Sequence, residues 1–218
     1  MSAAHCMILR SVQYLLLPHE EGAREMTINL RDRRRQQTAR EIQLVALRLS
    51  LCLGYPAVTT DSIAAEAGIS PRTFFNYYPN KQAAVLGAPP SLDCDCAAWL
   101  VTSTAPLRSD LARLLGTMLE QKQLDRQIVR MIEQIWDSAP ELMTIFRNSM
   151  DNIALSIGRL LEARLGPDRR LEAMLVAELA THALSNAVRA WAADETMSVA
   201  DIPPLIERQM AEVGRLVS

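Results

Sequence analysis

The sequence has few aromatic residues, few cysteines, few histidines and no long apolar runs, and each scarcity excludes a class of protein. Aromatic residues make up 5% of the chain and no sustained alternation of β-branched residues occurs, so a β-sheet architecture is not expected. Four cysteines with no secretory signal before them do not indicate a disulfide framework, and the cytoplasm is the expected location. No apolar run approaches the length that crosses a bilayer, so no membrane partner is expected.

Motifs of enzymes are missing as well. The chain has no P-loop, no glycine-rich dinucleotide fingerprint, no H-E-x-x-H pair and no nucleophile elbow, and its three histidines are scattered. We therefore expect no enzyme activity, no catalytic residue, no cofactor and no metal. One alternative stays open, because the thiols of Cys94 and Cys96 could bind a soft metal with a third ligand from elsewhere, or sense oxidation.

The composition and the breakers predict an all-α protein. Hydrophobic residues form 49% of the 218 residues, and Ala, Leu and Met are plentiful. Gly87-Ala88-Pro89-Pro90 is the strongest break in helical pattern. We expect an N-terminal extension of uncertain role over 1–30, a first domain over 31–87 and a second, helical domain over 88–218. Residues 1–25 are interpreted as non-essential, or else as an extra helix packed on the body.

Charge is unevenly spread along the chain. The net charge is −2, but residues 31–87 carry eight Lys and Arg against four Asp and Glu, a balance of +4. Residues 88–218 carry 13 against 18, a balance of −5. A basic domain on a mildly acidic one is typical of a protein that contacts nucleic acid with one part only.

Residues 59–81 predict two short helices joined by a tight turn. Thr60 is expected to cap the first helix, and Gly68 is expected to end it in the left-handed conformation. Ser70 caps the second helix, which we expect to continue to Pro79, and Asn80 caps a third.

The second of these helices has two different faces. Phe74 and Tyr78 lie one turn apart and are apolar enough to pack on the helices beneath. Arg72 and Asn76 lie one turn apart on another face, where Arg can bind guanine and Asn can bind adenine in the major groove. The alternative is an ordinary helical hairpin with a solvated polar face.

The run VTTDSIAAEAGISPRTFFNYYPNKQAAVLG resembles the DNA-binding motif of the tetracycline-repressor (TetR/AcrR) family of bacterial transcriptional regulators. The resemblance covers about residues 38–87. Many relatives carry Tyr where this chain has Phe75, so a phenol-to-phosphate hydrogen bond is lost there and Phe75 can act only by apolar contact. The family implies an N-terminal three-helix domain with a helix-turn-helix, followed by a helical domain for ligand binding and dimerisation.

The resemblance also implies residues that bind DNA. Arg72 and Asn76 would select bases, and Thr60, Tyr77 and Lys81 would hold phosphates. The expected DNA-binding set is Thr60, Ser70, Arg72, Thr73, Phe75, Asn76, Tyr77 and Lys81. A basic arm is expected to add phosphate or minor-groove contacts through Arg33, Arg34 and Arg35.

The end of the chain predicts two long helices with broad apolar faces, at about 168–193 and 203–216. In the first, apolar residues recur at alternating spacings of three and four, as in a coiled-coil seam, while Leu171, Leu175 and Leu179 form a second apolar edge. Because relatives dimerise through a four-helix bundle, we expect these helices to form the homodimer; the alternative is that they complete a monomer core. The expected interface residues are Met174, Ala177, Thr181, Leu184, Val188, Trp191, Ile206, Met210 and Val213.

The family further implies a small-molecule pocket among the central helices. Its expected lining combines adaptable Met and aromatic side chains with two polar ones. The residues are Met118, Met131, Trp136, Met143, Phe146, Met150, Asn186 and Arg189.

Together with the sequence patterns, the resemblance therefore implies a homodimeric repressor that binds a palindromic operator in double-stranded DNA and is released by a small-molecule ligand. Two alternatives remain. One is an activator or corepressor-dependent regulator of the same fold, and the other is an α-helical ligand-binding or interaction protein that does not read DNA.

Overall fold

The described part of the chain is entirely α-helical with short 3-10 turns. The computed structural model describes the backbone of residues 20–88, 90, 92, 97–120 and 124–217 and, except for residues 20–29 and Asp137, their side chains. No strand occurs among these residues, as the composition predicts. Two compact units are formed, by residues 1–41 and by residues 42–218, and each is described by itself.

Helix α2, Glu20–Leu53, runs from the first unit into the second. In the sequence, apolar residues repeat at helical spacing at Ile42, Val45, Ala46, Leu49 and Leu53 and predict a helix from Thr38 to Leu53. The structure begins this helix 18 residues earlier. Arg, Gln, Glu and Leu are good helix formers and no proline occurs between Glu20 and Leu53, so nothing local stops the helix before the apolar stripe begins.

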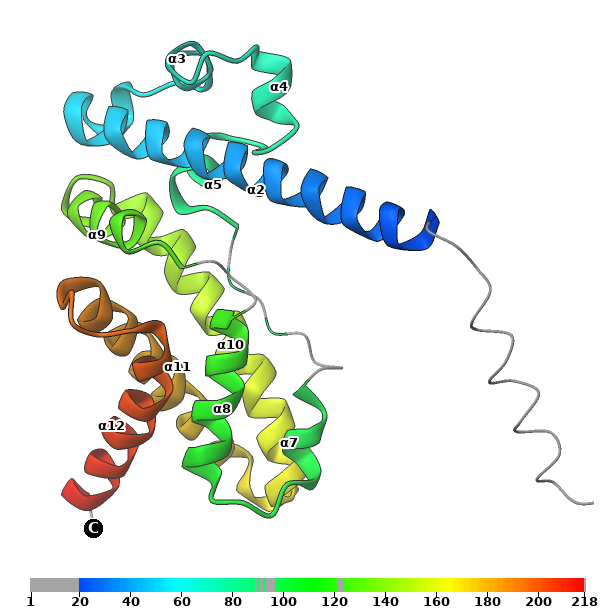
Figure 1. Ribbon diagram of the computed structural model, residues 1–218. Coiled ribbons are helices and arrows are strands. Elements are labelled where there is room, and N and C mark those ends of the chain that lie inside the picture. The colour runs from blue at the N-terminus through cyan, green and yellow to red at the C-terminus, as the bar shows by residue number, and fades with distance from the viewer. Residues whose placement is uncertain (1–19, 89, 91, 93–96, 121–123, 218) are drawn as a thin grey trace, which may run out of the picture. The chain divides into compact units, whose positions relative to one another are not determined.

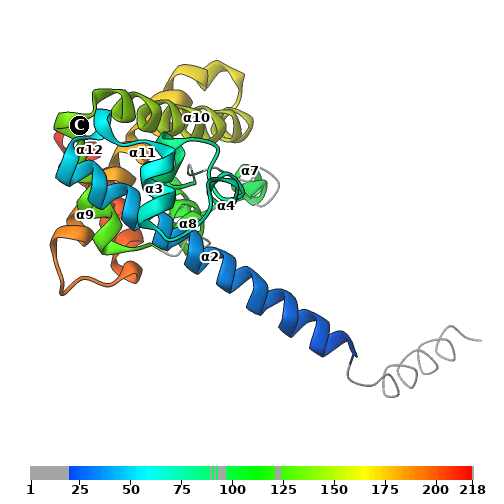
Figure 2. The same cartoon turned by 90° about the horizontal axis from the view of Figure 1, so that it is seen from above.

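The helix-turn-helix region follows α2. A 3-10 turn, Tyr55–Ala57, leads into three short helices: α3, Thr60–Glu66; α4, Pro71–Phe75; and α5, Lys81–Leu86. Figures 1 and 2 both show α3 and α4 as consecutive short helices joined by a tight turn. Ile42, Ile63 and Phe74 are almost fully buried, so the second half of α2 supplies part of the apolar support for α3 and α4.

The remaining helices form one hydrophobic core. Their bounds are α7, Trp99–Thr102; α8, Leu107–Glu120; α9, Arg126–Ile135; α10, Pro140–Leu165; α11, Arg170–Ala193; and α12, Ile202–Leu216. Short 3-10 turns precede or follow them at Trp136–Ser138, Pro167–Arg169 and Val199–Asp201. Helix α10 packs along α11, α11 packs on α12, and α12 packs on α8 (Figure 1).

Two glycines allow these helices to approach closely. A Cβ atom on Gly116 of α8 would lie 2.7 Å from Cγ of Pro203 in α12, and a Cβ on Gly158 of α10 would lie 2.2 Å from the sulfur of Met174 in α11. The proline ring is rigid, so the α8–α12 contact depends on a small residue at Gly116, whereas a Cβ at Gly158 would displace the flexible side chain of Met174.

A buried ion pair ties α8 to the end of α10. The Arg164 guanidinium lies 2.8 Å from the Asp110 carboxylate and also donates to the carbonyl of Ala105 at 2.7 Å. Asp110 is 4% exposed. Such a pair is costly to break from one side, because the remaining charge stays buried.

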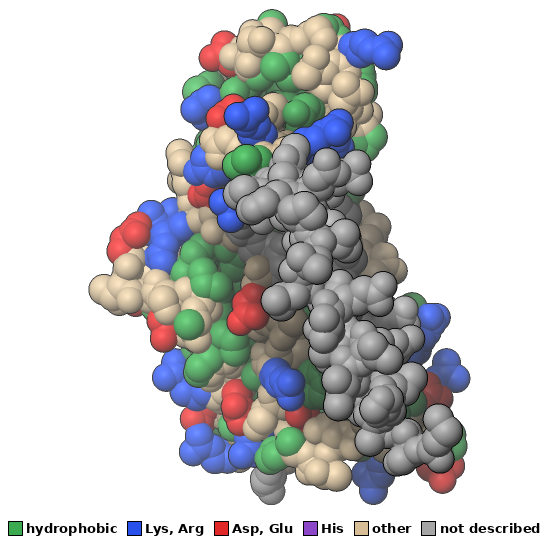
Figure 3. All heavy atoms as spheres, turned by 45° about the vertical axis from the view of Figure 1, so that its right-hand side comes forward, with side chains coloured by type: hydrophobic (Ala, Val, Ile, Leu, Met, Phe, Trp, Pro, Cys, Tyr) green, Lys and Arg blue, Asp and Glu red, His purple; other side chains and the backbone are tan. Residues whose placement is uncertain are grey.

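Some sequence expectations about burial are wrong. Cys52, which we interpret from the sequence as a core residue, is exposed, and Leu53 is 60% exposed. Both lie in the last turn of α2, where the stripe of buried residues has already ended at Ser50. On the face drawn in Figure 3, hydrophobic side chains reach the surface between charged ones.

Candidate nucleic-acid interface

The start of α3 is fixed by a capping box one residue earlier than the sequence suggests. The Thr59 side chain accepts from the backbone N–H of Ser62 at 3.1 Å, and the Ser62 hydroxyl accepts from the N–H of Thr59 at 3.0 Å. The prediction of Thr60 as the cap is therefore wrong. In the Thr-Thr pair only Thr59 has a serine three residues ahead to reciprocate, and Thr60 is left half-buried as the first helical residue.

The turn between α3 and α4 depends on Gly68. Its φ of 68° is left-handed, as predicted. The N–H of Ile69 donates to the carbonyl of Ala64 and the N–H of Gly68 donates to the carbonyl of Ala65, which is the Schellman pattern of helix endings. These hydrogen bonds fix the direction in which the chain enters α4.

Ser70 and Thr73 shape the start of α4. The Ser70 hydroxyl accepts from the N–H of Thr73 at 3.1 Å and lies 2.8 Å from the Thr73 hydroxyl. Pro71 occupies the first helical position, as predicted. The helix ends at Phe75 and not at Pro79, because the N–H groups of Asn76 and Tyr77 bond in the tighter 3-10 manner to Thr73 and Phe74.

The predicted two faces of α4 are present. Phe74 is fully buried and Tyr78 is 8% exposed, with ring centroids 6.3 Å apart. Arg72, Phe75 and Asn76 are all exposed. Because they follow one another at i, i+3 and i+4, these three side chains share one face of the helix. The buried rings thus fix the helix and the opposite face is turned outward.

Thr73 and Tyr77, one turn apart, are half-buried beside this outward face. Both are positioned at its edge, between the buried rings and the exposed side chains. This placement suits contacts to the sugar-phosphate backbone of a nucleic acid that lies against the outward face of α4.

Lys81 has contacts inside the domain that its sequence position does not suggest. Its Nζ donates to the carbonyl of Val58 at 3.0 Å and to that of Tyr55 at 3.2 Å, and lies 4.4 Å from the centre of the Tyr55 ring. The two carbonyls use two of the three N–H bonds of the Lys81 ammonium group. The predicted phosphate contact would therefore use the third. At a separation of 23 to 26 residues, no local sequence signal identifies this contact.

Tyr55 lies where the helix-turn-helix region meets the rest of the second unit. Its side chain is 1% exposed, and its hydroxyl has no hydrogen-bond partner among the described residues. Burial, and secondly the negative charge of Glu141 in the first turn of α10, raise the pKa of Tyr55 from 10.0 to about 12. Helix α5 also contacts α10.

The predicted basic arm is helical. Arg33, Arg34 and Arg35 are exposed on the part of α2 that belongs to the first unit. Consecutive residues of a helix point about 100° apart, so the three guanidinium groups fan around the helix and do not form a single row.

The predicted ligand-pocket residues are not all brought together. The rings of Trp136 and Phe146 are in tilted contact with centroids 5.5 Å apart, and the Ser185 hydroxyl donates to the sulfur of Met150 at 3.8 Å. Met131 and Met143 are half-buried, and Met118 is 9% exposed in the main core. Asn186 and Arg189 are exposed on α11 instead, and Arg189 pairs with Glu133 of α9 at 3.3 Å.

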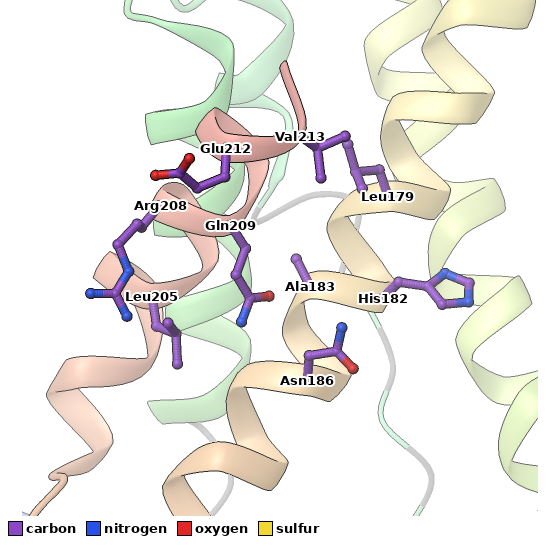
Figure 4. Close-up of a pocket in the computed structure, with 9 residues that line it drawn as sticks. All are labelled: Leu179, His182, Ala183, Asn186, Leu205, Arg208, Gln209, Glu212 and Val213. Carbon is purple, nitrogen blue, oxygen red and sulfur yellow. The ribbon is translucent and has the colours of Figure 1, made fainter. Parts of the chain in front are cut away.

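A groove runs between α11 and α12. It has a volume of about 460 Å³ and contains Asn186 of the predicted pocket set. In Figure 4, Leu179 and Val213 approach each other across it, while His182 points away from α12. The lining residues are Leu179, His182, Ala183, Asn186, Leu205, Arg208, Gln209, Glu212 and Val213.

Most of the predicted interface seam lies inside the chain's own core. Only Met174 and Val188, which are half-buried, and Val213, which is 36% exposed, reach the surface. The six residues that are buried within the single chain are Ala177, Thr181, Leu184, Trp191, Ile206 and Met210. Side chains that are already buried cannot face a second molecule.

The other apolar edge of α11 reaches the surface. Leu171 is 77% exposed and Leu175 is 65% exposed, and Leu179 continues the row into the groove. The sequence shows this second edge, but its spacing does not tell which edge faces inward.

Cys94 and Cys96 lie outside the described residues. Within the part that the structure describes, no group of three or more His, Cys, Asp and Glu could hold a metal ion, and no helix is long and apolar enough to cross a membrane.

Comparison with known proteins identifies the helix-turn-helix region. Residues 44–86 match the family model described as bacterial regulatory proteins, tetR family. No match was found among curated proteins.

Similar solved structures cover most of the chain at low identity. One is a tetR-family transcriptional regulator from Mesorhizobium loti, with 16% identity over 82% of this chain and 96% of that one and a TM-score of 0.46. Another is the fatty acid degradation regulator FadR from Bacillus halodurans, with 17% identity over 79% and 94% and a TM-score of 0.48. A third is the multidrug binding protein EbrR in complex with imidazole, with 20% identity over 78% and 93% and a TM-score of 0.38.

Proposed function

The chain belongs to the tetR family of bacterial regulatory proteins through its residues 44–86, and we propose that this transcriptional regulator is a ligand-responsive repressor that binds a palindromic operator as a homodimer in the cytoplasm. One observation carries the proposal. Helix α4 is anchored by the buried rings of Phe74 and Tyr78 and turns Arg72, Phe75 and Asn76 outward together.

That outward face suits the major groove. A guanidinium can donate to both guanine O6 and N7, and an amide can pair with adenine N6 and N7, so Arg72 and Asn76 select bases. Phosphate contacts then set the position of α4 on the duplex. Thr60, Tyr77 and the remaining N–H of Lys81 supply them, together with Ser70 and Thr73 at the start of the helix.

The exposed arginines of α2 add affinity without selecting sequence. Each phosphate that Arg33, Arg34 or Arg35 neutralises releases counterions from the DNA, which makes binding weaker as salt rises. The proposal for these arginines depends on their charge and on their exposure on α2.

Dimerisation uses the exposed faces of α11 and α12. Leu171 and Leu175 are large apolar side chains at the surface, and Leu179 and Val213 line the adjoining groove. A second copy that covers these residues forms a four-helix bundle with two-fold symmetry. Because a two-fold dimer presents two copies of α4, its operator must be palindromic.

The ligand acts by shifting a population. A small molecule that binds better to a dimer with widely spaced reading helices lowers the fraction that can span adjacent grooves. The half-buried Trp136 and Phe146 pair and the neighbouring Met150 are the side chains that we propose to contact it.

Selection of bound fragments from genomic DNA tests the proposal. The full chain should recover fragments that share one palindrome and should bind this palindrome less tightly as the salt concentration rises. It should also repress a reporter gene placed downstream of the palindrome. Recovery of unrelated fragments with no common sequence would contradict DNA reading. Increased reporter expression would instead identify an activator.

A further inference from the structure

Phe75 is an exposed aromatic ring in a fixed position. It is the last residue of α4 and is 53% exposed, although Phe has no polar group to satisfy in water. Its ring meets that of the fully buried Phe74 edge to face, with centroids 5.4 Å apart and planes at 89°. The contact with Phe74 holds the exposed ring against a side chain that is fully buried in the fold.

The position of Phe75 limits what it can contact. It shares the outward face of α4 with Arg72 and Asn76, so a duplex that these two residues read also covers Phe75. A benzyl side chain cannot donate to a phosphate or to a base edge. Covering an aromatic ring is favourable when its partner is apolar.

The major groove offers one apolar group on the edges of its bases, the C5 methyl group of thymine. We propose that Phe75 recognises the methyl group of one thymine in each half-site, next to the base that Arg72 or Asn76 contacts. This inference rests on the proposed function, in which α4 enters the major groove. It adds a base preference that hydrogen bonding does not supply.

Replacing thymine by deoxyuridine tests the inference, because deoxyuridine pairs in the same way but lacks the methyl group. Duplexes of the selected operator, each with one symmetric pair of thymines replaced, are titrated with the full chain by fluorescence anisotropy at fixed salt. The protein should bind the duplex substituted at one particular position of each half-site roughly threefold to tenfold more weakly, which is the effect expected for losing one buried methyl group. The other positions should bind as the unmodified duplex does.

Two variants assign the effect to the residue. Phe75→Ala should bind thymine and deoxyuridine duplexes equally at that position, and Phe75→Leu, which stays apolar, should keep part of the difference. Thermal unfolding shows whether each variant is folded. If Phe75→Ala is unfolded, the inference is judged from Phe75→Leu and from the titrations of the wild-type chain with the deoxyuridine duplexes.

Three results would overturn the inference: deoxyuridine has no effect at any position, the effect persists unchanged in Phe75→Ala, or the operator half-site contains no thymine. If the chain selects a site but ignores the methyl groups, this inference alone fails. If it selects no site, the proposed function fails with it.

Discussion

The ammonium nitrogen of Lys81 lies 3.0 Å from the carbonyl oxygen of Val58. Val58 directly precedes the Thr59 cap of α3, and Lys81 is the first residue of α5. One side chain therefore joins the entrance of the helix-turn-helix to the helix that leaves it. Lys81, which the resemblance to the family predicts to bind phosphate, thus also stabilises the domain by hydrogen bonds to backbone carbonyls.

Two substitutions of Lys81 should separate these roles. Lys81→Ala removes both, and should lower the free energy of unfolding by about 1–2 kcal/mol and weaken binding to all DNA sequences alike. Lys81→Gln can still donate to the Val58 carbonyl but has no charge. It should retain most of the stability and reduce the slope of affinity against salt by about 1. Denaturant titration and salt titration measure the two effects, and an unchanged salt slope in Lys81→Gln would exclude the phosphate contact.

Two buried tyrosines should make the protein sensitive to high pH. Burial raises the pKa of Tyr78 to about 12, and burial with the Glu141 charge raises that of Tyr55 to about 12, against 10.0 in the unfolded chain. Between pH 10 and 12 the unfolded state loses these protons first, so rising pH favours unfolding. The stabilisation is complete below about pH 10 and is lost as pH rises towards 12.

Denaturant unfolding between pH 8 and 11.5 measures this decline. One pKa unit corresponds to about 1.4 kcal/mol, so the stability of the wild-type protein should fall steeply above pH 10. Tyr55→Phe and Tyr78→Phe should each make the fall shallower. Equal slopes in the wild type and both variants would show that neither phenol causes the decline.

The Asp110–Arg164 pair should be important for stability. Asp110→Ala leaves the Arg164 guanidinium with carbonyl partners only and should cost about 3–5 kcal/mol. Arg170, whose side chain is 72% exposed and lies 3.9 Å from Glu162, provides the matched control. Arg170→Gln should change stability by less than about 1 kcal/mol. Similar costs in the two variants would mean that burial does not distinguish the pairs.

Leu175 should be needed for dimerisation. Leu175→Glu places a charge on a residue that is 65% exposed in the single chain, so folding should be unaffected. A charge buried at the proposed interface is strongly unfavourable, and sedimentation should show a monomer with weakened operator binding. Leu155→Glu on α10, where Leu155 is 41% exposed, should remain dimeric. A dimeric Leu175→Glu protein would place the interface elsewhere.

Local structure around α4 was predictable because its signals act over a few residues. The Gly68 turn and the caps at Ser70 and Asn80 were all confirmed, since each depends on a short hydrogen bond or a single backbone angle. Thr60 was wrong by one residue, because two adjacent threonines compete for one cap and only Thr59 finds a reciprocating serine.

Burial on α11 could not be predicted in the same way. Ala177 and Leu175 both lie on apolar edges, yet the first is fully buried and the second is mostly exposed. Periodicity shows that two edges exist, whereas the positions of α8, α9, α10 and α12 decide which edge is covered. The contact between Lys81 and Val58 is likewise produced by tertiary packing alone.

Titration of the selected operator with Arg72→Ala and Asn76→Ala tests the outward face of α4 most directly. Each variant should lose about 1–3 kcal/mol of binding free energy and relax the preference at one base position. Arg159→Ala, which removes the same charge from an exposed site on α10, should bind as the wild type does. If Arg72→Ala and Asn76→Ala bound the operator with wild-type affinity and wild-type base preference, α4 would not be the part of the protein that reads DNA.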